Sequence, residues 1–177
     1  NAVPFFTFTK EMLAFDPAGY SLKWYEDFFT NLNWQGAVQN SVIIAIFSTL
    51  ISTTLGTLAA LGLSRAQMPY RTLIMSILIS PMIVPLIISA AGMFFFYSRI
   101  GIQGTHIAVI LAHAALGTPF VVITVTATLS GFDNNLIRAS SSLGATPSTT
   151  FFSVIVPLIT PGVISGALFA FITSFDE

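Results

Sequence analysis

The sequence predicts an all-α polytopic membrane protein, a transmembrane helix bundle with about four spans, and three observations lead to this fold class. Only six basic and seven acidic residues occur among 177, or 7 %, against about 25 % in an average soluble domain. Hydrophobic residues make up 54 % of the chain. The few charges leave four long uncharged windows between them. A chain of this composition is unlike a soluble domain, and it excludes intrinsic disorder, which needs polarity and charge.

Each of the four uncharged windows exceeds the roughly 20 apolar residues that cross a bilayer. After their polar edges are trimmed, the expected spans lie near residues 41–64, 72–97, 105–129 and 151–175. At about 1.5 Å per residue each is about 36–39 Å long, which is enough to cross with some tilt.

The connecting loops predict the orientation of these spans. The first loop carries Arg65 and Arg71 without an acidic residue, which is typical of a cytoplasmic loop. Alternation then places residues 98–104 outside, 130–150 inside and 1–40 outside. The chain begins with Asn and ends directly after an apolar run, so we expect a piece of a longer membrane protein.

Small residues recur at every fourth position of the first expected span, and the last span contains a GxxxG at Gly162 and Gly166. Such rows lie on one helix face and predict close helix packing in preference to pore lining. The two rows of the first span are Ser48, Ser52, Gly56, Ala60 and Ser64, and Ser41, Ala45, Thr49, Thr53 and Thr57.

Prolines interrupt three of the four expected spans: Pro81 and Pro85 the second, Pro119 the third, and Pro157 and Pro161 the fourth. Each proline removes a backbone donor and bends or breaks a helix. They can be kinks that serve packing, or broken helices around a translocation path, as in many transporters. Their number favours transport.

Few ionisable residues fall inside the spans. His106 and His113 lie about 10 Å apart along a helix, too far to share one metal ion, and no metal site is expected. His113 is either a functional group or, as we favour, a neutral histidine hydrogen-bonded across helices. Asp176 and Glu177 either attract a cation inside the membrane or lie at its edge. The candidate residues of a translocation path are therefore Pro81, Pro85, His113, Asp176 and Glu177.

No catalytic motif is present. Lys10 and Lys23 do not follow the glycine of a P-loop, and HExxH, GxSxG and EF-hand patterns do not occur. We therefore expect no catalytic residues, no bound cofactor and an energy source outside this chain.

The loop at residues 130–150 is the most informative segment. Asp133 is a good N-cap, Gly144 a good C-cap, and Pro147 prevents continuation, which together predict a short cytoplasmic helix. So short a helix is marginal alone and needs contact with another surface, either the membrane interface or a partner. Its apolar face comprises Leu136, Ala139 and Leu143.

This loop and the residues after it resemble the "EAA" loop of binding-protein-dependent ABC transporter permeases, the MetI-like transmembrane domain. The matching residues are Asp133, Leu136, Ala139, Leu143, Gly144, Ala145, Ile155, Pro157, Pro161 and Gly162. The chain departs from the pattern at Arg138, where a Glu usually stands, at Ser140 and at Val156. Spermidine/putrescine-type members are the most similar, on Trp24-Tyr25, Asn40-Ser41, Ala59–Ala66, Ser80-Pro81 with Pro85, and Ser174–Glu177.

The resemblance implies a transport subunit and no enzyme activity. It implies a periplasmic lead-in segment at 1–40 and a permease domain at 41–177, in a bacterial inner membrane. The expected partners are a second permease, homologous or identical, cytoplasmic ATPase subunits that bind the ATP, and a periplasmic binding protein, and the expected solute is a polyamine or a similar small cation. The residues expected to couple the helix at 133–146 to the ATPase are Asp133, Leu136, Arg138, Ala139, Ser140, Leu143, Gly144 and Ala145.

Two alternatives remain. The chain could be an ion-coupled secondary carrier that uses His113 and the terminal carboxylates, or a structural subunit without a transport path. The loop resemblance favours the importer permease over both.

Overall fold

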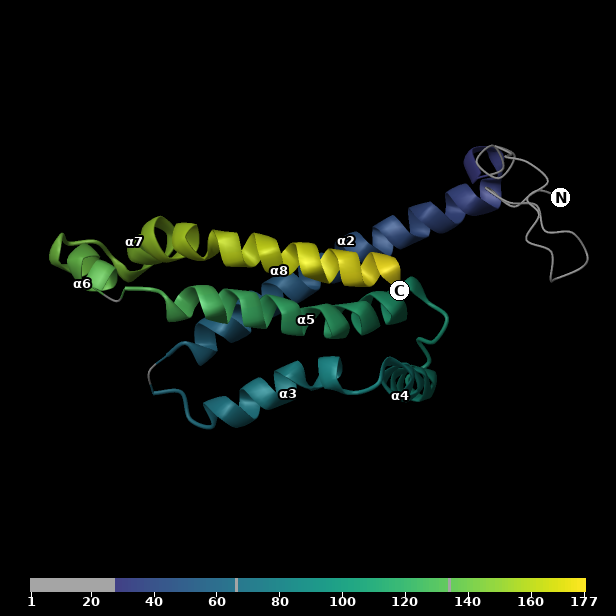
Figure 1. Cartoon of the computed structure of the whole chain (residues 1–177), viewed down its shortest axis with the longest axis horizontal. Coiled ribbons are helices and arrows are strands. Elements are labelled where there is room, and N and C mark those ends of the chain that lie inside the picture. Colours follow the sequence, from purple (N-terminus) through teal and green to yellow (C-terminus); the bar gives the residue numbers. More distant parts are fainter. Residues whose placement is uncertain (1–27, 66, 134) are drawn as a thin grey trace, which may run out of the picture. The chain divides into compact units, whose positions relative to one another are not determined.

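The computed structural model describes residues 28–65, 67–133 and 135–177, and its regular elements there are all helices (Figure 1). The predicted all-α class is confirmed, whereas most of the expected lead-in segment, including Trp24-Tyr25, lies outside the described residues. The chain divides into units 1–42 and 43–177, and the helices after α2 all belong to the second unit. The helices are α2 (Leu32–Leu63), α3 (Arg71–Ile83), α4 (Leu86–Arg99), α5 (His106–Ser130), α6 (Asn135–Ser142), α7 (Pro147–Thr150), the π-helical turn η1 (Phe151–Ile155) and α8 (Val156–Asp176).

Three stretches are long and apolar enough to cross a membrane: α2, α5 and the run Pro147–Asp176, which joins α7, η1 and α8. The helix α2 contains the expected span 41–64 except for residue 64, and α5 contains the span 105–129 except for residue 105. The third stretch contains all of the expected span 151–175. The helix α2 begins well before residue 41, because polar residues without charge or proline continue a helix beyond the apolar core. With α3 and α4 counted as a broken span, the predicted four spans are found, and the chain is a multi-pass membrane protein.

The expected span at 72–97 is not a straight helix. It is broken between α3 and α4, whose axes differ by 102°, and Figure 1 shows α3 from the side and α4 end-on. Val84 is extended, as residues before proline prefer. Pro85 has no N–H to continue the helix, and its carbonyl accepts the N–H of Ile88 (2.9 Å) to start α4. The predicted proline break is therefore found at Pro85.

The other prolines remain within helices. Pro81 lies inside α3, and the hydroxyl of Ser80 donates to the Ile77 carbonyl (2.7 Å), which lacks its usual donor because residue 81 is proline. Pro157 follows η1, where the N–H of Val156 bonds to the carbonyl of Phe151, five residues earlier. A π-helical turn of this kind absorbs a proline without ending the helix.

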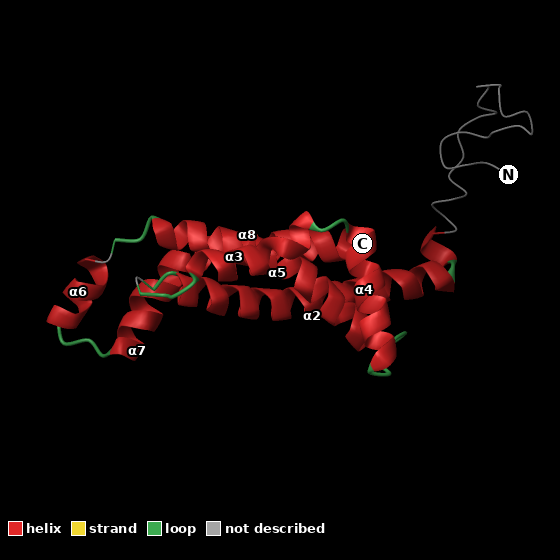
Figure 2. Cartoon of the chain, turned by 90° about the horizontal axis from the view of Figure 1, so that it is seen from below, coloured by secondary structure: helices red, strands yellow, loops and turns green. Residues whose placement is uncertain are grey.

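The second unit is held together where α5 packs on α8 and on the part of α2 after residue 42. A Cβ atom at Gly56 would lie 2.6 Å from Cβ of Val121, and one at Gly166 only 2.8 Å from Cα of Val121. The predicted GxxxG and the first small-residue row therefore are packing surfaces, as expected. Figures 1 and 2 both show α5 alongside α8. The buried members of that row are Ser48, Ser52, Gly56 and Ala60.

Candidate functional site

The N-terminus of the short helix α6 is capped as predicted. A carboxylate oxygen of Asp133 accepts the N–H of Asn135 (2.9 Å), and the Asp133 carbonyl accepts the N–H of Leu136 (3.1 Å). These bonds satisfy donors that a helix start leaves free, so Asp133 defines where α6 begins.

The C-terminus of α6 is a glycine turn, also as predicted. Gly144 has φ +82°, a conformation that favours glycine. The N–H of Gly144 bonds to the Ser141 carbonyl (3.0 Å), and the N–H of Ala145 bonds to the Ser140 carbonyl (3.1 Å). This pair of bonds is a Schellman motif, and it turns the chain sharply away from the helix axis toward α7.

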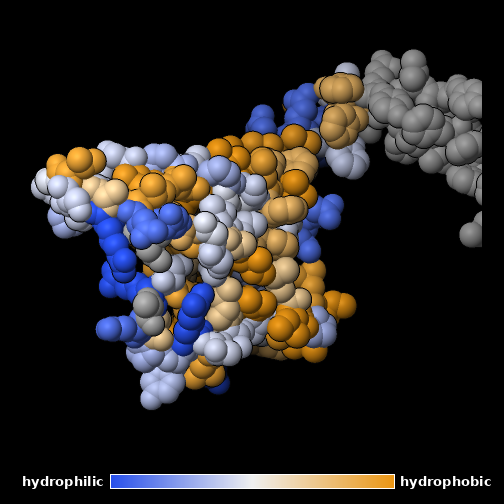
Figure 3. All heavy atoms as spheres, turned by 60° about the vertical axis from the view of Figure 1, so that its left-hand side comes forward, coloured by the Kyte–Doolittle hydropathy of each residue, from blue (hydrophilic) through white to orange (hydrophobic). Residues whose placement is uncertain are grey.

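The predicted apolar face of α6 points away from the rest of the chain. Leu136 and Ala139 are exposed, and Leu143 is 88 % exposed. Arg138 is exposed as well. Figure 3, in which the α6 end comes forward, shows apolar and polar side chains next to each other there. The helix therefore presents leucines at a surface that the described part of the chain does not cover.

The opposite side of α6 is anchored by Thr150, a residue whose role the sequence did not reveal. The hydroxyls of Ser140 and Thr150 lie 2.7 Å apart, and Thr150 is only 5 % exposed. Ile137, one turn before Ser140, is half-buried. Among the expected coupling residues Ser140 thus faces inward, and it connects α6 to the helical run that begins at Pro147.

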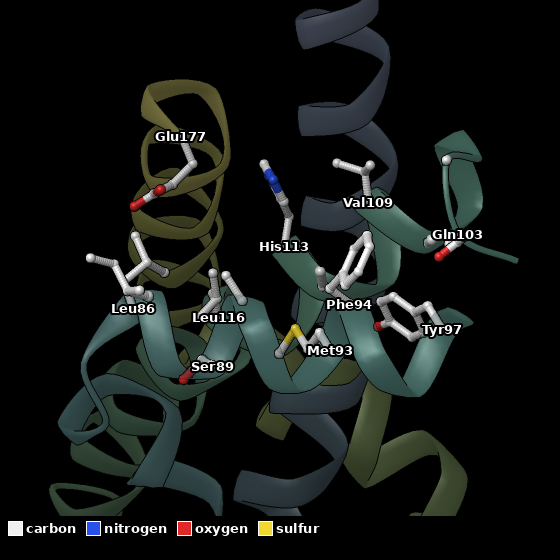
Figure 4. Close-up of a pocket in the computed structure, with 15 residues that line it drawn as sticks. Leu86, Ser89, Met93, Phe94, Tyr97, Gln103, Val109, His113, Leu116 and Glu177 are labelled. Atoms are coloured by element: carbon white, nitrogen blue, oxygen red, sulfur yellow. The ribbon is translucent and has the colours of Figure 1, made fainter. Parts of the chain in front are cut away.

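A cavity of about 380 Å³ lies among α4, α5 and the end of α8 (Figure 4). Of the expected path residues, His113 and Glu177 line it. Its wall is otherwise mainly apolar, as is usual for small-molecule sites. The aromatic side of the cavity was missed, although the run Phe94 to Tyr97 could have indicated it. The newly found lining residues with aromatic or polar groups are Ser89, Phe94, Tyr97 and Gln103.

A second cavity of about 350 Å³ lies at the break between α3 and α4. Pro81, Pro85 and Glu177 line it, so four of the five expected path residues surround the two cavities. Asp176 is exposed and lines neither of them.

His113 is hydrogen-bonded across helices, as favoured from the sequence. Its Nδ1 lies 2.9 Å from the hydroxyl and 3.1 Å from the carbonyl of Ser174 in α8. The Ser174 hydroxyl in turn lies 2.8 Å from that of Ser48 in α2. Ser174 and Ser48 are 5 % and 1 % exposed, so this network connects three helices in the packed interior. Nowhere in 28–65, 67–133 or 135–177 do three His, Asp or Glu side chains gather as metal ligands would.

Comparison with known proteins adds a family and several relatives. The family "Binding-protein-dependent transport system inner membrane component" matches residues 52–177. The spermidine/putrescine transport system permease protein PotC of Haemophilus influenzae is 32 % identical over 97 % of this chain and 66 % of its own length. PotC of Escherichia coli K12 is 31 % identical over 90 % of this chain and 60 % of its own. The putrescine transport system permease protein PotI of E. coli K12 is 28 % identical over 97 % of this chain and 64 % of its own length. The chain thus spans less than two thirds of the length of these relatives.

Proposed function

Because the chain belongs to the binding-protein-dependent transport system inner membrane component family, we propose that it is the transmembrane permease subunit of an ATP-driven importer in a bacterial inner membrane. Residues 41–177 belong to the permease domain, and residues 1–40 form a periplasmic lead-in segment. ATP is bound and hydrolysed by separate cytoplasmic subunits, and a periplasmic binding protein delivers the solute. A second permease, homologous or identical, completes the pore.

The observation that carries this proposal is the exposed leucine face of α6. Burying a leucine side chain stabilises by about 1.5–3 kcal/mol, and a helix of eight residues is marginal alone. A partner that covers Leu136 and Leu143 supplies both the burial and the order. The partner of this helix is the ATPase subunit, with Asp133, Arg138, Ala139 and Ala145 beside the leucines at the contact.

The anchoring of α6 gives the coupling a mechanical route. Ser140 bonds to Thr150 in α7, and α7 continues through η1 into α8. A displacement of α6 by the ATPase is therefore passed to the membrane helix α8. Gly144 matters here because its turn sets the direction of α6 relative to α7.

The solute is a polyamine or a similar small cation. Relatives with this specificity in their names support the class, and so does the site. Glu177 supplies a negative charge at the wall of both cavities, and Asp176 adds a second charge beside it. His113 and the prolines Pro81 and Pro85 complete the proposed path.

Cross-linking tests the proposed partner. The 177-residue sequence has no cysteine, so Ser141→Cys on the exposed surface of α6 provides one new thiol in the full-length protein, purified gently from its membrane. We expect a cross-link to a co-purifying P-loop ATPase, and none from Thr105→Cys, which is exposed at the opposite end of α5. A chain that purifies alone, yet moves solute in vesicles without ATP, would establish the secondary carrier instead.

Gly144→Ala tests the coupling. A side chain at φ +82° costs about 1–2 kcal/mol, so transport and stimulated ATP hydrolysis should fall while membrane insertion is unchanged. Gly131→Ala is the matched control, since Gly131 has φ −87° at the end of α5. Loss of insertion in Gly144→Ala alone would contradict a coupling role.

A further inference from the structure

A groove of about 510 Å³ runs along one face of α3. Only its last residue, Ile83, also lines a cavity of the candidate site. All of its lining residues come from α3 and follow helical spacing, so they share one side of that helix. They are Arg71, Thr72, Met75, Ser76, Ile79 and Ile83.

The polarity of this groove changes along the helix axis. Arg71 and Thr72 lie at its start and the Ser76 hydroxyl one turn later, whereas Ile79 and Ile83 form its far end. At about 1.5 Å per residue, Arg71 and Ile83 lie about 18 Å apart along the axis. One leaflet of the hydrocarbon core is about 15 Å thick. A charged head and an apolar tail as long as one leaflet is deep are the features of a membrane lipid.

The charge at the head of the groove is positive and has no acidic neighbour in the chain. Arg65 follows α2 and Arg71 opens α3, while the sequence from 28 to 132 contains no acidic residue. Figure 1 shows that α3 begins at the end of the second unit where α5 ends and α6 follows, which is the side expected to face the cytoplasm. Anionic phospholipids of the cytoplasmic leaflet attract such basic residues, and arginine binds phosphate through charge-assisted hydrogen bonds.

The tail of the groove is a surface that the described part of the chain leaves uncovered. No residue of α3 is buried, and Ile83 is 75 % exposed. Exposure alone does not select a ligand, because lipid tails are as apolar as leucine and cover any such helix in a bilayer. A groove that begins at a cationic head is different, since it holds one chain of a lipid whose phosphate is fixed at Arg71.

We propose that the face of α3 from Arg71 to Ile83 binds one anionic phospholipid of the cytoplasmic leaflet. Its phosphate pairs with the guanidinium of Arg71 and accepts a hydrogen bond from the hydroxyl of Thr72. One acyl chain lies along Ile79 and Ile83. The bound lipid holds α3 in place up to the break before α4. Such a site is independent of the solute that the protein carries and therefore goes beyond the proposed function.

Native mass spectrometry of the purified full-length protein, with any subunits that co-purify, measures this binding. The probes are phosphatidylglycerol and phosphatidylcholine with identical acyl chains. We expect one phosphatidylglycerol per chain to bind saturably, with an apparent Kd about tenfold below that of phosphatidylcholine, as for one charge-assisted contact.

Substitutions of Arg71 test the head of the site. In Arg71→Gln the two lipids should bind alike. Arg71→Lys keeps the charge and should retain most of the preference, which separates a loss of charge from a loss of folding. Arg99→Gln is the matched control and should keep the full preference, because Arg99 is exposed at the end of α4 and does not line the groove.

Ile79→Ala tests the tail of the site. It should raise the apparent Kd of both lipids about threefold and keep their ratio, because contacts with the acyl chain are lost while the charge remains. Ile77→Ala is its control and should change neither value, since Ile77 is 61 % exposed on the same helix but does not line the groove.

Several outcomes would overturn the lipid site. They are equal binding of the two lipids by the unaltered protein, a preference that persists in Arg71→Gln, and an Ile79→Ala protein that binds like Ile77→Ala. A protein dimer that these variants split, without release of lipid, would assign the face to a second copy instead. None of these results touches the importer, which is tested separately by cross-linking and ATP-dependent uptake.

Discussion

The helices α5 and α8 and the pair α3 and α4 are all largely apolar, yet they pack in different ways. Between α5 and α8 the backbones are so close that Gly162 and Gly166 have no room for a methyl group. In α3 and α4 no residue is buried at all. Side-chain size at the contact is one difference between them. Small residues recur at every fourth position of α2 and α8, which pack on α5, whereas leucine, isoleucine and methionine make up most of α3.

This contrast divides the second unit into a fixed part and a part that can move. Interdigitated helices resist displacement, because any shift opens voids or forces overlaps. Helices without buried residues lose little packing when they shift. Both cavities lie where the two parts meet, since residues of α5 and of the α3–α4 pair line each of them. Substitutions in the two parts should therefore differ in which property they change.

The largest effect on stability is expected from a methyl group in the packed contact. In Gly56→Ala the new Cβ lies 2.6 Å from Cβ of Val121 and 3.2 Å from the carbonyl oxygen of Thr118, and neither atom can rotate away. Overpacking of this kind costs about 1–3 kcal/mol. We expect a clearly lowered unfolding temperature of the purified protein in detergent.

The control for this variant lies on the same helix. A Cβ atom at Gly62 would have no neighbouring atom within 4 Å. Alanine also favours a helix over glycine by about 0.5–1 kcal/mol. Gly62→Ala should leave the unfolding temperature unchanged or raise it. If Gly56→Ala is as stable as Gly62→Ala, the α2–α5 contact is looser than these distances imply.

A smaller effect is expected from the hydrogen-bond network in the same contact. Ser174→Ala removes the hydroxyl that links His113 to Ser48. Hydrogen bonds between membrane helices contribute about 0.6 kcal/mol on average and rarely above about 1.7. The free energy of unfolding should therefore fall by an amount of that order. A double-mutant cycle with Ser48→Ala measures the link itself.

The matched control removes a hydroxyl that has no partner. The Oγ1 atom of Thr53 in α2 is buried without a hydrogen bond, and valine has nearly the same shape. Thr53→Val should be neutral or stabilising, because an unpaired buried polar atom is itself costly. If Thr53→Val lowers the unfolding free energy as much as Ser174→Ala does, the loss in Ser174→Ala comes from packing and not from the hydrogen bonds.

Much of this arrangement could be predicted from the sequence, and the reasons differ by element. The caps of α6 at Asp133 and Gly144 are local, since they depend on bonds between neighbours in the chain. The small-residue faces follow from helical periodicity. The sequence predicts a break at Pro81 or Pro85 but does not decide between the two. At Pro81 the helix continues because the Ser80 hydroxyl donates to the Ile77 carbonyl, and this bond depends on side-chain geometry.

The rest depends on contacts between distant segments, which periodicity does not encode. The anchor between Ser140 and Thr150 and the lining of both cavities by Leu86, Leu116 and Glu177 are contacts of this kind. The aromatic side of the first cavity required the 102° bend, which turns α4 so that Phe94 and Tyr97 line the space next to His113. In the sequence alone these residues are only part of an apolar span.

A change in stability of similar size, but with a functional consequence, is expected at the break itself. Pro85→Ala restores a backbone N–H after Val84, so the preference for ending α3 there is weakened. Its direct cost in unfolding free energy is about 0.4–1 kcal/mol, from the greater freedom of the unfolded chain. Because α3 and α4 bury no residue, no packing is lost in addition. We therefore expect an unfolding temperature close to the original but altered solute uptake, because Leu86, which lines both cavities, follows the break directly.

Pro81→Ala separates the break from proline content in general. Pro81 already lies inside α3, and alanine there would donate its own N–H to the Ile77 carbonyl, so α3 is kept or strengthened and the break stays at Val84 and Pro85. Uptake should be nearer to the original than in Pro85→Ala, although both residues line the second cavity. Equal uptake defects in the two variants would mean that the shape of that cavity, and not the bend that positions Leu86, limits transport. The division into fixed and movable parts would then have to be drawn elsewhere.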